Sequence, residues 1–137
     1  MAADIRKVTQ SFSVAPQIEP EDVATAKAQG FVKLINNRPD GEVPGQPTSD
    51  QMEAAARAAG LDYVHIPFAG RPTPEQAEAV AREAEGAGGP VLAFCRSGTR
   101  SITAWSLGQA MAGLRAPTEL VELAAGAGYD LSPILGG

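Results

Sequence analysis

Cysteine, histidine and tryptophan each occur only once in the 137 residues of this chain. A single cysteine excludes an internal disulfide framework and leaves no second thiol in the chain for a redox reaction. One cysteine and one histidine cannot build a zinc site by themselves. We therefore predict neither a metal nor any other cofactor.

The chain also lacks a surplus of basic residues and any long apolar run. Its net charge is −5, and its 11 Lys and Arg residues form no stripe, which argues against nucleic acid as a partner. No segment approaches the roughly 18 apolar residues of a membrane span, and the first residues lack the apolar core of a signal peptide. We expect a cytoplasmic protein without a membrane partner, and the sequence leaves the oligomeric state open.

Short apolar stretches alternate with helical patterns along the whole chain. The length and a hydrophobic content of 44% predict one domain, residues 1–137, with a substantial core. Strands are predicted at 11–15, 31–35, 61–66 and 90–94, and helices at 20–29, 48–59, 73–85, from about 101 and from 117 to about 126. This alternation predicts an α/β fold with a parallel sheet of about four strands flanked by helices. Ligands of such sheets bind beyond the carboxyl ends of the strands.

The single cysteine stands directly after the last predicted strand, in Pro90-Val-Leu-Ala-Phe-Cys95-Arg-Ser-Gly-Thr-Arg100-Ser101. A strand that leads through a tight loop into a helix points several backbone N–H groups at one spot. Arg96 and Arg100 add positive charge there. Such surroundings favour a reactive thiolate and bind an oxyanion. The alternative is a buried structural cysteine, since free cysteine is among the most buried residue types. The two arginines favour a nucleophile.

The residues after the cysteine have the composition of an anion-binding loop. Glycine at position 98 allows a positive φ, so the loop amides can approach an anion closely. The first helical turn places Ser101 where its hydroxyl could hydrogen-bond Cys95 or a leaving atom. The predicted catalytic residues are Cys95, Arg100 and Ser101. The predicted anion-binding residues are Arg96, Ser97, Gly98, Thr99 and Arg100.

Two known folds resemble different parts of this chain. The loop Cys95-Arg-Ser-Gly-Thr-Arg100 resembles the active loop of rhodanese-type sulfurtransferases, whereas residues 31–40, residues 63–67 and the cysteine strand, in that order, resemble cysteine-dependent protein phosphatases. The combination is similar to a small bacterial family, the phosphatase-like domain of beta-lactamase-hydrolase-like proteins (DUF442), also described as sulfurtransferases. This resemblance covers roughly residues 11–114. It implies a cysteine-phosphatase/rhodanese-like fold in which Cys95 is the nucleophile, Arg100 binds the anion and the amides of residues 96–100 surround it.

The chain departs from the phosphatase pattern in two ways. Four residues separate Cys95 from Arg100, where protein tyrosine phosphatases have five, and the shorter loop suits a sulfane sulfur better than a tetrahedral phosphate. Dual-specificity phosphatases carry a general acid after the third strand, but residues 68–72 contain no carboxylate. Losing a general acid typically costs about 10²- to 10⁴-fold in rate. Sulfur transfer releases a stable anion and needs no such acid.

These departures favour an enzyme that carries sulfur as a persulfide on Cys95, with a small anionic sulfur substrate. The alternative is a protein tyrosine or dual-specificity phosphatase-like hydrolase that forms a phosphocysteine. A third hypothesis is a non-catalytic module that binds an anion or a phosphopeptide in the same loop.

Three further residues lie in loops at the same predicted edge of the sheet. Asp40 could replace the missing acid, although a turn aspartate before a glycine is the more ordinary interpretation. Arg38 and Arg71 could extend a positive rim for an anionic substrate, or could be solvated loop charges. We expect His65 to be structural and Trp105 to lie in the core.

Overall fold

A five-stranded sheet forms the centre of the described part of the chain. The structure is a computed structural model that describes residues 3–136. Its strands are β1 (Arg6–Lys7), β2 (Phe12–Ala15), β3 (Lys33–Asn36), β4 (Asp62–His65) and β5 (Val91–Phe94). They lie in the order β1-β2-β5-β3-β4, in which β1 is antiparallel to β2 and the other four are parallel. The strand that precedes the cysteine, β5, is therefore the central one.

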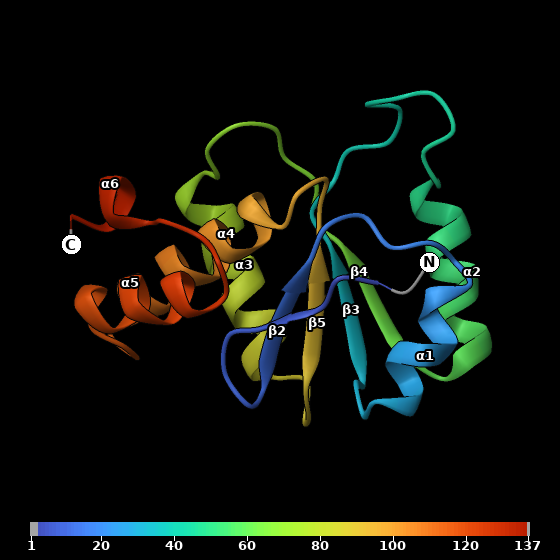
Figure 1. Ribbon diagram of the computed structural model, residues 1–137, viewed down its shortest axis with the longest axis horizontal. Coiled ribbons are helices and arrows are strands. Elements are labelled where there is room, and N and C mark those ends of the chain that lie inside the picture. The colour runs from blue at the N-terminus through green and yellow to red at the C-terminus, as the bar shows by residue number, and fades with distance from the viewer. Residues whose placement is uncertain (1–2, 137) are drawn as a thin grey trace.

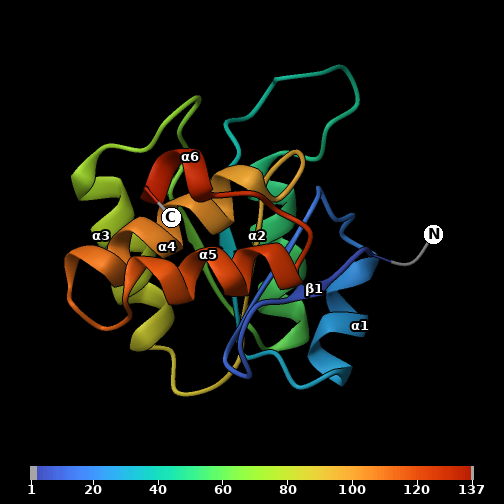
Figure 2. The ribbon, with the colours of Figure 1, turned by 60° about the vertical axis from the view of Figure 1, so that its left-hand side comes forward.

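Helices cover both faces of the sheet, as Figures 1 and 2 show. One face carries α1 (Asp22–Ala28) and α2 (Ser49–Ala59). The other carries α3 (Pro74–Glu85), α4 (Thr99–Met111), α5 (Pro117–Gly126) and α6 (Ser132–Leu135). This arrangement confirms the predicted α/β class with a mostly parallel sheet. None of these helices has both the length and the apolar character needed to cross a bilayer, in the part of the chain that the structure describes.

The helix starts follow from local sequence. Thr48 accepts a hydrogen bond from the Gln51 backbone while the Gln51 side chain accepts one from the Thr48 backbone, which is a complete capping box at α2. Thr73 and Gln76 form the same arrangement at α3, with Pro74 in the first turn. Both capping boxes confirm the sequence prediction.

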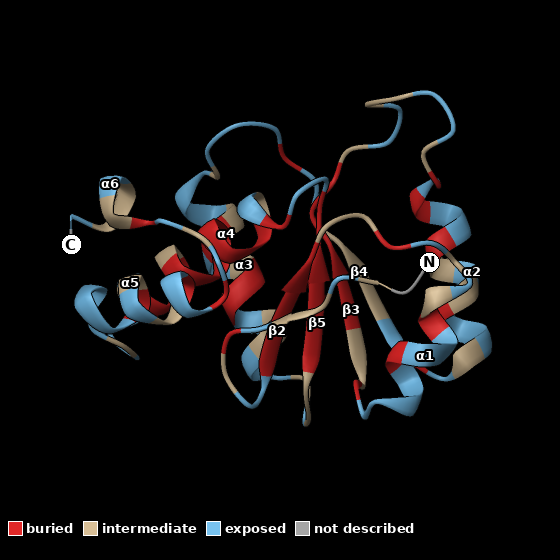
Figure 3. Ribbon diagram, viewed as in Figure 1, coloured by how far each residue is buried: buried red, intermediate tan, exposed pale blue. Residues whose placement is uncertain are grey.

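Burial is concentrated in the strands β2, β5 and β3 and in α4 (Figure 3). On the α4 side, Phe12 stacks on Trp105 with ring centroids 4.5 Å apart, which confirms Trp105 as a core residue. On the opposite side, Met52 of α2 and Val23 of α1 pack with the buried Leu34 of β3. The sheet is thus buried on both faces, which explains why β5 is continuously apolar.

The structure differs from the sequence prediction at several boundaries. The predicted strand at 31–35 lies at Lys33–Asn36, and the helix expected from about residue 101 begins at Thr99. Two elements were not predicted, β1 and α6. The first has two polar residues and exists because Arg6 pairs with Val14 of β2, so no periodic pattern within it could indicate a strand.

Candidate active site

Cys95 follows β5 at the carboxyl edge of the sheet, where the loops after β3, β4 and β5 begin beside one another at the upper end of the sheet in Figure 1. The residue is fully buried, and its backbone N–H donates to the Ala15 carbonyl oxygen of the neighbouring strand at 3.4 Å. The short segment that follows leads directly into α4. The strand, loop and helix predicted from the sequence are therefore present, with Cys95 at the start of the loop.

The loop points a backbone donor at the cysteine. The Gly98 N–H lies 3.1 Å from Cys95 Sγ and donates to it. Gly98 has a φ of +91°, a conformation that favours glycine. The side chains of Arg96, Ser97 and Thr99 are exposed, and Ser97 Oγ donates to Thr99 Oγ1 at 3.0 Å. We call residues 95–100 the anion loop from here on.

Arg100 lies in the first turn of α4 and binds a carboxylate that the sequence analysis did not single out. Its Nη1 and Nη2 atoms donate to the two oxygens of Glu42 at 2.9 and 2.8 Å. Nη1 also donates to the Phe68 carbonyl oxygen at 3.0 Å. A guanidinium has five N–H groups, so these three contacts leave two for a bound anion.

The same carboxylate contacts a second arginine. Arg38 Nε donates to Glu42 Oε1 at 2.8 Å, and Arg38 Nη1 donates to Gln17 Oε1 at 3.2 Å. The Arg38 side chain is only 4% exposed, so the expectation of a solvated loop charge is wrong. Glu42 therefore bridges Arg100 and the buried Arg38.

This pairing fixes the protonation of Glu42. Hydrogen bonds from Arg100, and then from Arg38, lower the pKa of Glu42 to about 2. In turn, the pairing with Glu42 raises the pKa of Arg100 above its already high ordinary value. At neutral pH Glu42 is therefore a carboxylate, and in this arrangement it holds no proton for a leaving group.

Ser101 contacts Asn37, and not Cys95 as predicted. Its hydroxyl donates to Asn37 Oδ1 at 2.8 Å and not to Cys95. The Asn37 backbone N–H donates to the Phe94 carbonyl at 2.8 Å, and its side-chain amide donates to the Ile66 carbonyl at 3.0 Å. Ser101 thus links the start of α4 to the ends of β5 and β4, which fixes the position of the loop between them.

The remaining loop residues have separate environments. The Asp40 carboxylate accepts the Ser49 backbone N–H at 2.8 Å at the start of α2, which matches the turn interpretation and not a proton donor beside Cys95. Arg71 is exposed in the loop after β4, which fits both a rim residue and a solvated loop charge. His65 Nε2 lies 2.9 Å from the Arg38 carbonyl oxygen and has a structural contact, as expected.

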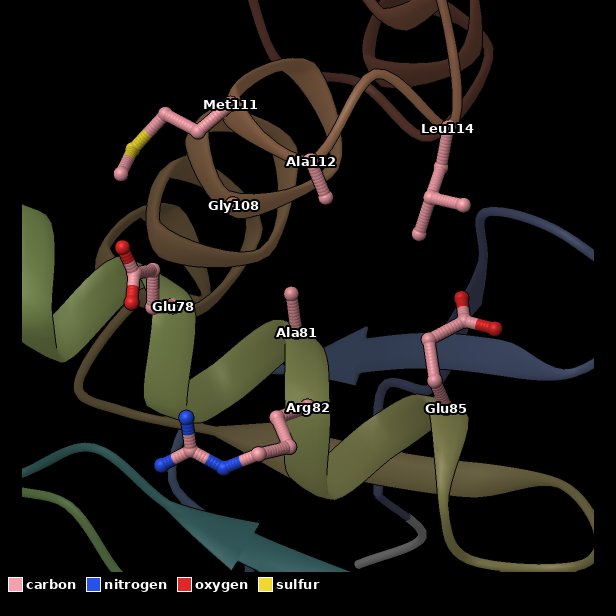
Figure 4. Close-up of a pocket in the computed structure, with 8 residues that line it drawn as sticks. All are labelled: Glu78, Ala81, Arg82, Glu85, Gly108, Met111, Ala112 and Leu114. Atoms are coloured by element: carbon pink, nitrogen blue, oxygen red, sulfur yellow. The ribbon is translucent and has the colours of Figure 1, made fainter.

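A separate pocket lies between α3 and α4, at the end of α4 farthest from Cys95 (Figure 4). A helix of this length separates its two ends by about 20 Å. The pocket is lined by Glu78, Ala81, Arg82, Glu85, Gly108, Met111, Ala112 and Leu114. It therefore does not belong to the Cys95 site.

Comparison with known proteins identifies the family. The family model for the phosphatase-like domain of beta-lactamase hydrolase-like proteins matches residues 4–112. The chain belongs to this family. A beta-lactamase hydrolase-like protein of Agrobacterium fabrum is 39% identical over 127 residues, which cover 91% of this chain and 29% of that protein. The chain thus spans less than a third of this relative's length.

Solved structures agree with the family assignment. The crystal structure of nma1982 from Neisseria meningitidis superposes with a TM-score of 0.83 at 28% identity, covering 96% of this chain and 94% of that one. TpbA from P. aeruginosa, solved in complex with pTyr, has a TM-score of 0.67 at 15% identity and covers 94% of this chain and 76% of its own. At that identity TpbA shares the fold alone.

Some residues of the candidate site were predicted from the sequence, and others were not. In the structure the Gly98 N–H donates to Cys95 Sγ, and Arg100 follows in the first turn of α4. The structure adds Asn37 and Glu42, both from the loop after β3. A signal for Asn37 existed in the sequence, because a polar residue directly after a buried strand stands at the ligand edge of the sheet. Glu42 lies within a Gly- and Pro-rich loop, whose path no sequence pattern indicates.

Proposed function

We propose that this phosphatase-like domain hydrolyses phosphomonoesters through a phosphocysteine on Cys95. The observation that carries the proposal is the Gly98 N–H at 3.1 Å from Cys95 Sγ, at the start of a helix whose first turn holds Arg100. The family and the shared fold support phosphate chemistry, so they favour the phosphatase alternative over the sulfurtransferase that the short loop and the missing acid indicated.

The first step forms the phosphocysteine. Cys95 Sγ attacks phosphorus, the ester P–O bond breaks, and the leaving oxygen keeps the electron pair of that bond. The two N–H groups of Arg100 that Glu42 and Phe68 do not occupy, together with the loop amides, are suited to stabilise the phosphoryl oxygens. Water then attacks the phosphocysteine, the S–P bond breaks, and inorganic phosphate and the thiolate are released.

The supply of a proton to the leaving group decides the substrate class. The loop after β4 holds no carboxylate at residues 68–72, and Glu42 is ionised. An alkoxide leaving group needs a proton, whereas a phenolate leaves far more easily without one. We therefore propose aryl phosphates, such as phosphotyrosine side chains, as the substrate class.

The test compares wild type with Cys95→Ser on p-nitrophenyl phosphate, a phosphotyrosine peptide and a phosphoserine peptide. We expect hydrolysis of the two aryl esters by wild type, little hydrolysis of phosphoserine, and none of any substrate by the variant. Acid quenching during turnover and intact-mass measurement should detect one phosphoryl group on wild type. Binding of the phosphotyrosine peptide without turnover would instead favour the non-catalytic module.

One observation keeps a second candidate function, sulfur transfer. Only four residues separate Cys95 from Arg100, which narrows the anion loop. With thiosulfate, Cys95 Sγ would attack the sulfane sulfur, the S–S bond would break and sulfite would leave, after which cyanide would take the sulfur as thiocyanate. Thiocyanate formation by wild type, with no hydrolysis of aryl phosphates, would establish this function in place of the phosphatase.

A further inference from the structure

The peptide unit between Ser97 and Gly98 is contacted at both of its polar ends. Its N–H donates to Cys95 Sγ at 3.1 Å, and its carbonyl oxygen accepts a hydrogen bond from the Tyr129 hydroxyl at 2.8 Å. A trans peptide is planar, and its N–H and C=O point in opposite directions. The Tyr129 hydroxyl and the cysteine sulfur therefore fix the orientation of one rigid plane between them.

The orientation of this plane matters for a thiolate. If the plane turned over, the Ser97 carbonyl oxygen would face Cys95 Sγ in place of the Gly98 N–H. An acceptor dipole beside a thiolate disfavours the charged form, whereas a donor favours it. Gly98 has the conformational freedom to permit such a rotation. A contact from outside the loop can therefore stabilise the donor orientation.

Tyr129 is placed by elements from both ends of the chain. Gly128, with a φ of +95°, turns the chain after α5, and the Tyr129 N–H donates to the Ala124 carbonyl at 2.8 Å. The Arg6 guanidinium of β1 lies over the tyrosine ring at 5.2 Å from its centroid. Figure 2 shows β1 beside the end of α5. The ring therefore has a defined position against the loop.

The contact between Tyr129 and the loop is close. A Cβ atom added to Gly98 would lie 2.1 Å from the Tyr129 hydroxyl oxygen, so the hydroxyl occupies the space beside the loop backbone. Burial raises the pKa of Tyr129, so its hydroxyl stays protonated and can donate throughout the physiological range. Tyr129 lies outside residues 4–112, the part that the family model matches.

We propose that Tyr129 is a positioning residue for the nucleophile: its hydroxyl holds the Ser97–Gly98 peptide so that the Gly98 N–H faces Cys95 Sγ. Only the kinetic consequence rests on the proposed phosphatase function. The chemical consequence, a more reactive Cys95, holds for any reaction of that thiolate.

The test compares Tyr129→Phe with Tyr63→Phe and wild type. Tyr63 is a matched control, because its partly buried hydroxyl is also hydrogen-bonded, to Ser49 Oγ at 2.7 Å and to the Asn36 side chain at 3.0 Å. The first measurement is the pH profile of Cys95 alkylation by iodoacetamide. We expect Tyr129→Phe to move the profile to higher pH by about half a unit or more, and Tyr63→Phe to leave it unchanged.

Two further measurements complete the test. Hydrogen exchange of the Gly98 amide, followed by NMR, requires no reagent to reach the buried sulfur. We expect faster exchange in Tyr129→Phe alone, by about tenfold. With p-nitrophenyl phosphate, we expect kcat of Tyr129→Phe to fall by about tenfold while KM changes little, because the binding groups of Arg100 remain.

The outcomes separate this inference from the proposed function. If alkylation and Gly98 exchange in Tyr129→Phe match wild type, the inference is wrong, even if the variant melts at a lower temperature. If both change while wild type hydrolyses no aryl phosphate, the positioning role stands and the phosphatase proposal fails.

Discussion

The two sides of the anion loop are held by different kinds of interaction. On one side, the Glu42 carboxylate binds Arg100 and the buried Arg38 through charged hydrogen bonds. On the other, the neutral Tyr129 hydroxyl binds the Ser97 carbonyl oxygen. A phosphate dianion would meet the charged side directly, because Arg100 belongs to it. Tyr129, on the neutral side, can affect Cys95 only through the Ser97–Gly98 peptide, whose N–H faces the sulfur. If the proposed function is right, we expect substrate affinity to depend on the charged side and the reactivity of Cys95 to depend on the neutral side.

Replacing Arg100, on the charged side, should cause the largest loss of activity. Arg100→Lys removes the planar fork that contacts Glu42 and a bound anion at the same time, and a lysine ammonium cannot reproduce it. We expect kcat/KM for p-nitrophenyl phosphate to fall by about 10²- to 10³-fold, the usual cost of losing a donor to the transition state. Inhibition by inorganic phosphate should weaken in parallel. Arg115→Lys, in the connection between α4 and α5, is the control that should keep both.

The predictable part of this site is local in sequence. An apolar strand is followed within six residues by a cysteine, a glycine and an arginine. This order specifies a strand, a tight loop and a helix start, so the positions of Cys95 in the loop and Arg100 in the helix could be predicted without a structure. The capping boxes at Thr48 and Thr73 are equally local. Such features depend on neighbours within one helical turn, which a sequence displays directly.

The unpredicted part depends on contacts between distant segments. Glu42 is 58 residues from Arg100, and Tyr129 is 32 residues from Ser97. Neither contact leaves a periodic signal, because each comes from the path of a loop or from the turn after a helix. The sequence also did not decide between sulfur and phosphate chemistry: the short loop from Cys95 to Arg100 and the missing acid at residues 68–72 favoured sulfur, while the family favours phosphate.

Glu42→Gln should show how much the Glu42 bridge between Arg38 and Arg100 contributes to the stability of the fold. The change leaves Arg38 buried without a carboxylate, which is costly for a buried ion pair. We expect the free energy of unfolding to fall on the order of 2 kcal/mol, less than for a fully buried pair because the Glu42 side chain is 23% exposed. Urea denaturation measures this difference.

Glu53→Gln is the matched control for that measurement. Glu53 pairs with Arg57 on the surface of α2, and the Arg57 side chain is 67% exposed. Exposed pairs of this spacing contribute about 0.5 kcal/mol or less. Equal losses for the two variants would mean that the Glu42 bridge contributes no more than an ordinary surface pair.

The charged side should also respond to acid, in a direction that follows from Glu42. Its pKa is lowered from 4.5 to about 2 in the folded protein. The ionised carboxylate therefore stabilises the folded protein at pH values above 4.5, the pKa of Glu42 in the unfolded chain. This contribution is lost as the pH falls from about 4.5 towards 2. We expect the difference in unfolding free energy between wild type and Glu42→Gln to shrink over this window. A difference that stays constant down to about pH 2.5 would contradict the assigned ionisation.

The smallest expected effect concerns Arg71, and it tests where the charged side ends. Arg71 is exposed in the loop after β4, whereas Arg100 is bound by Glu42 and by the Phe68 carbonyl of that same loop. An exposed charge acts on an anionic substrate mainly through screened attraction. We expect Arg71→Ala to raise KM for p-nitrophenyl phosphate by about twofold at low ionic strength, and the effect to disappear at about 1 M salt, where charges are screened within about 3 Å. The value of kcat should not change, because the residue contacts neither Cys95 nor Arg100 in the described structure. A loss of kcat, or a KM effect that survives high salt, would mean that Arg71 binds the phosphoryl group directly and that the charged side extends across the loop after β4.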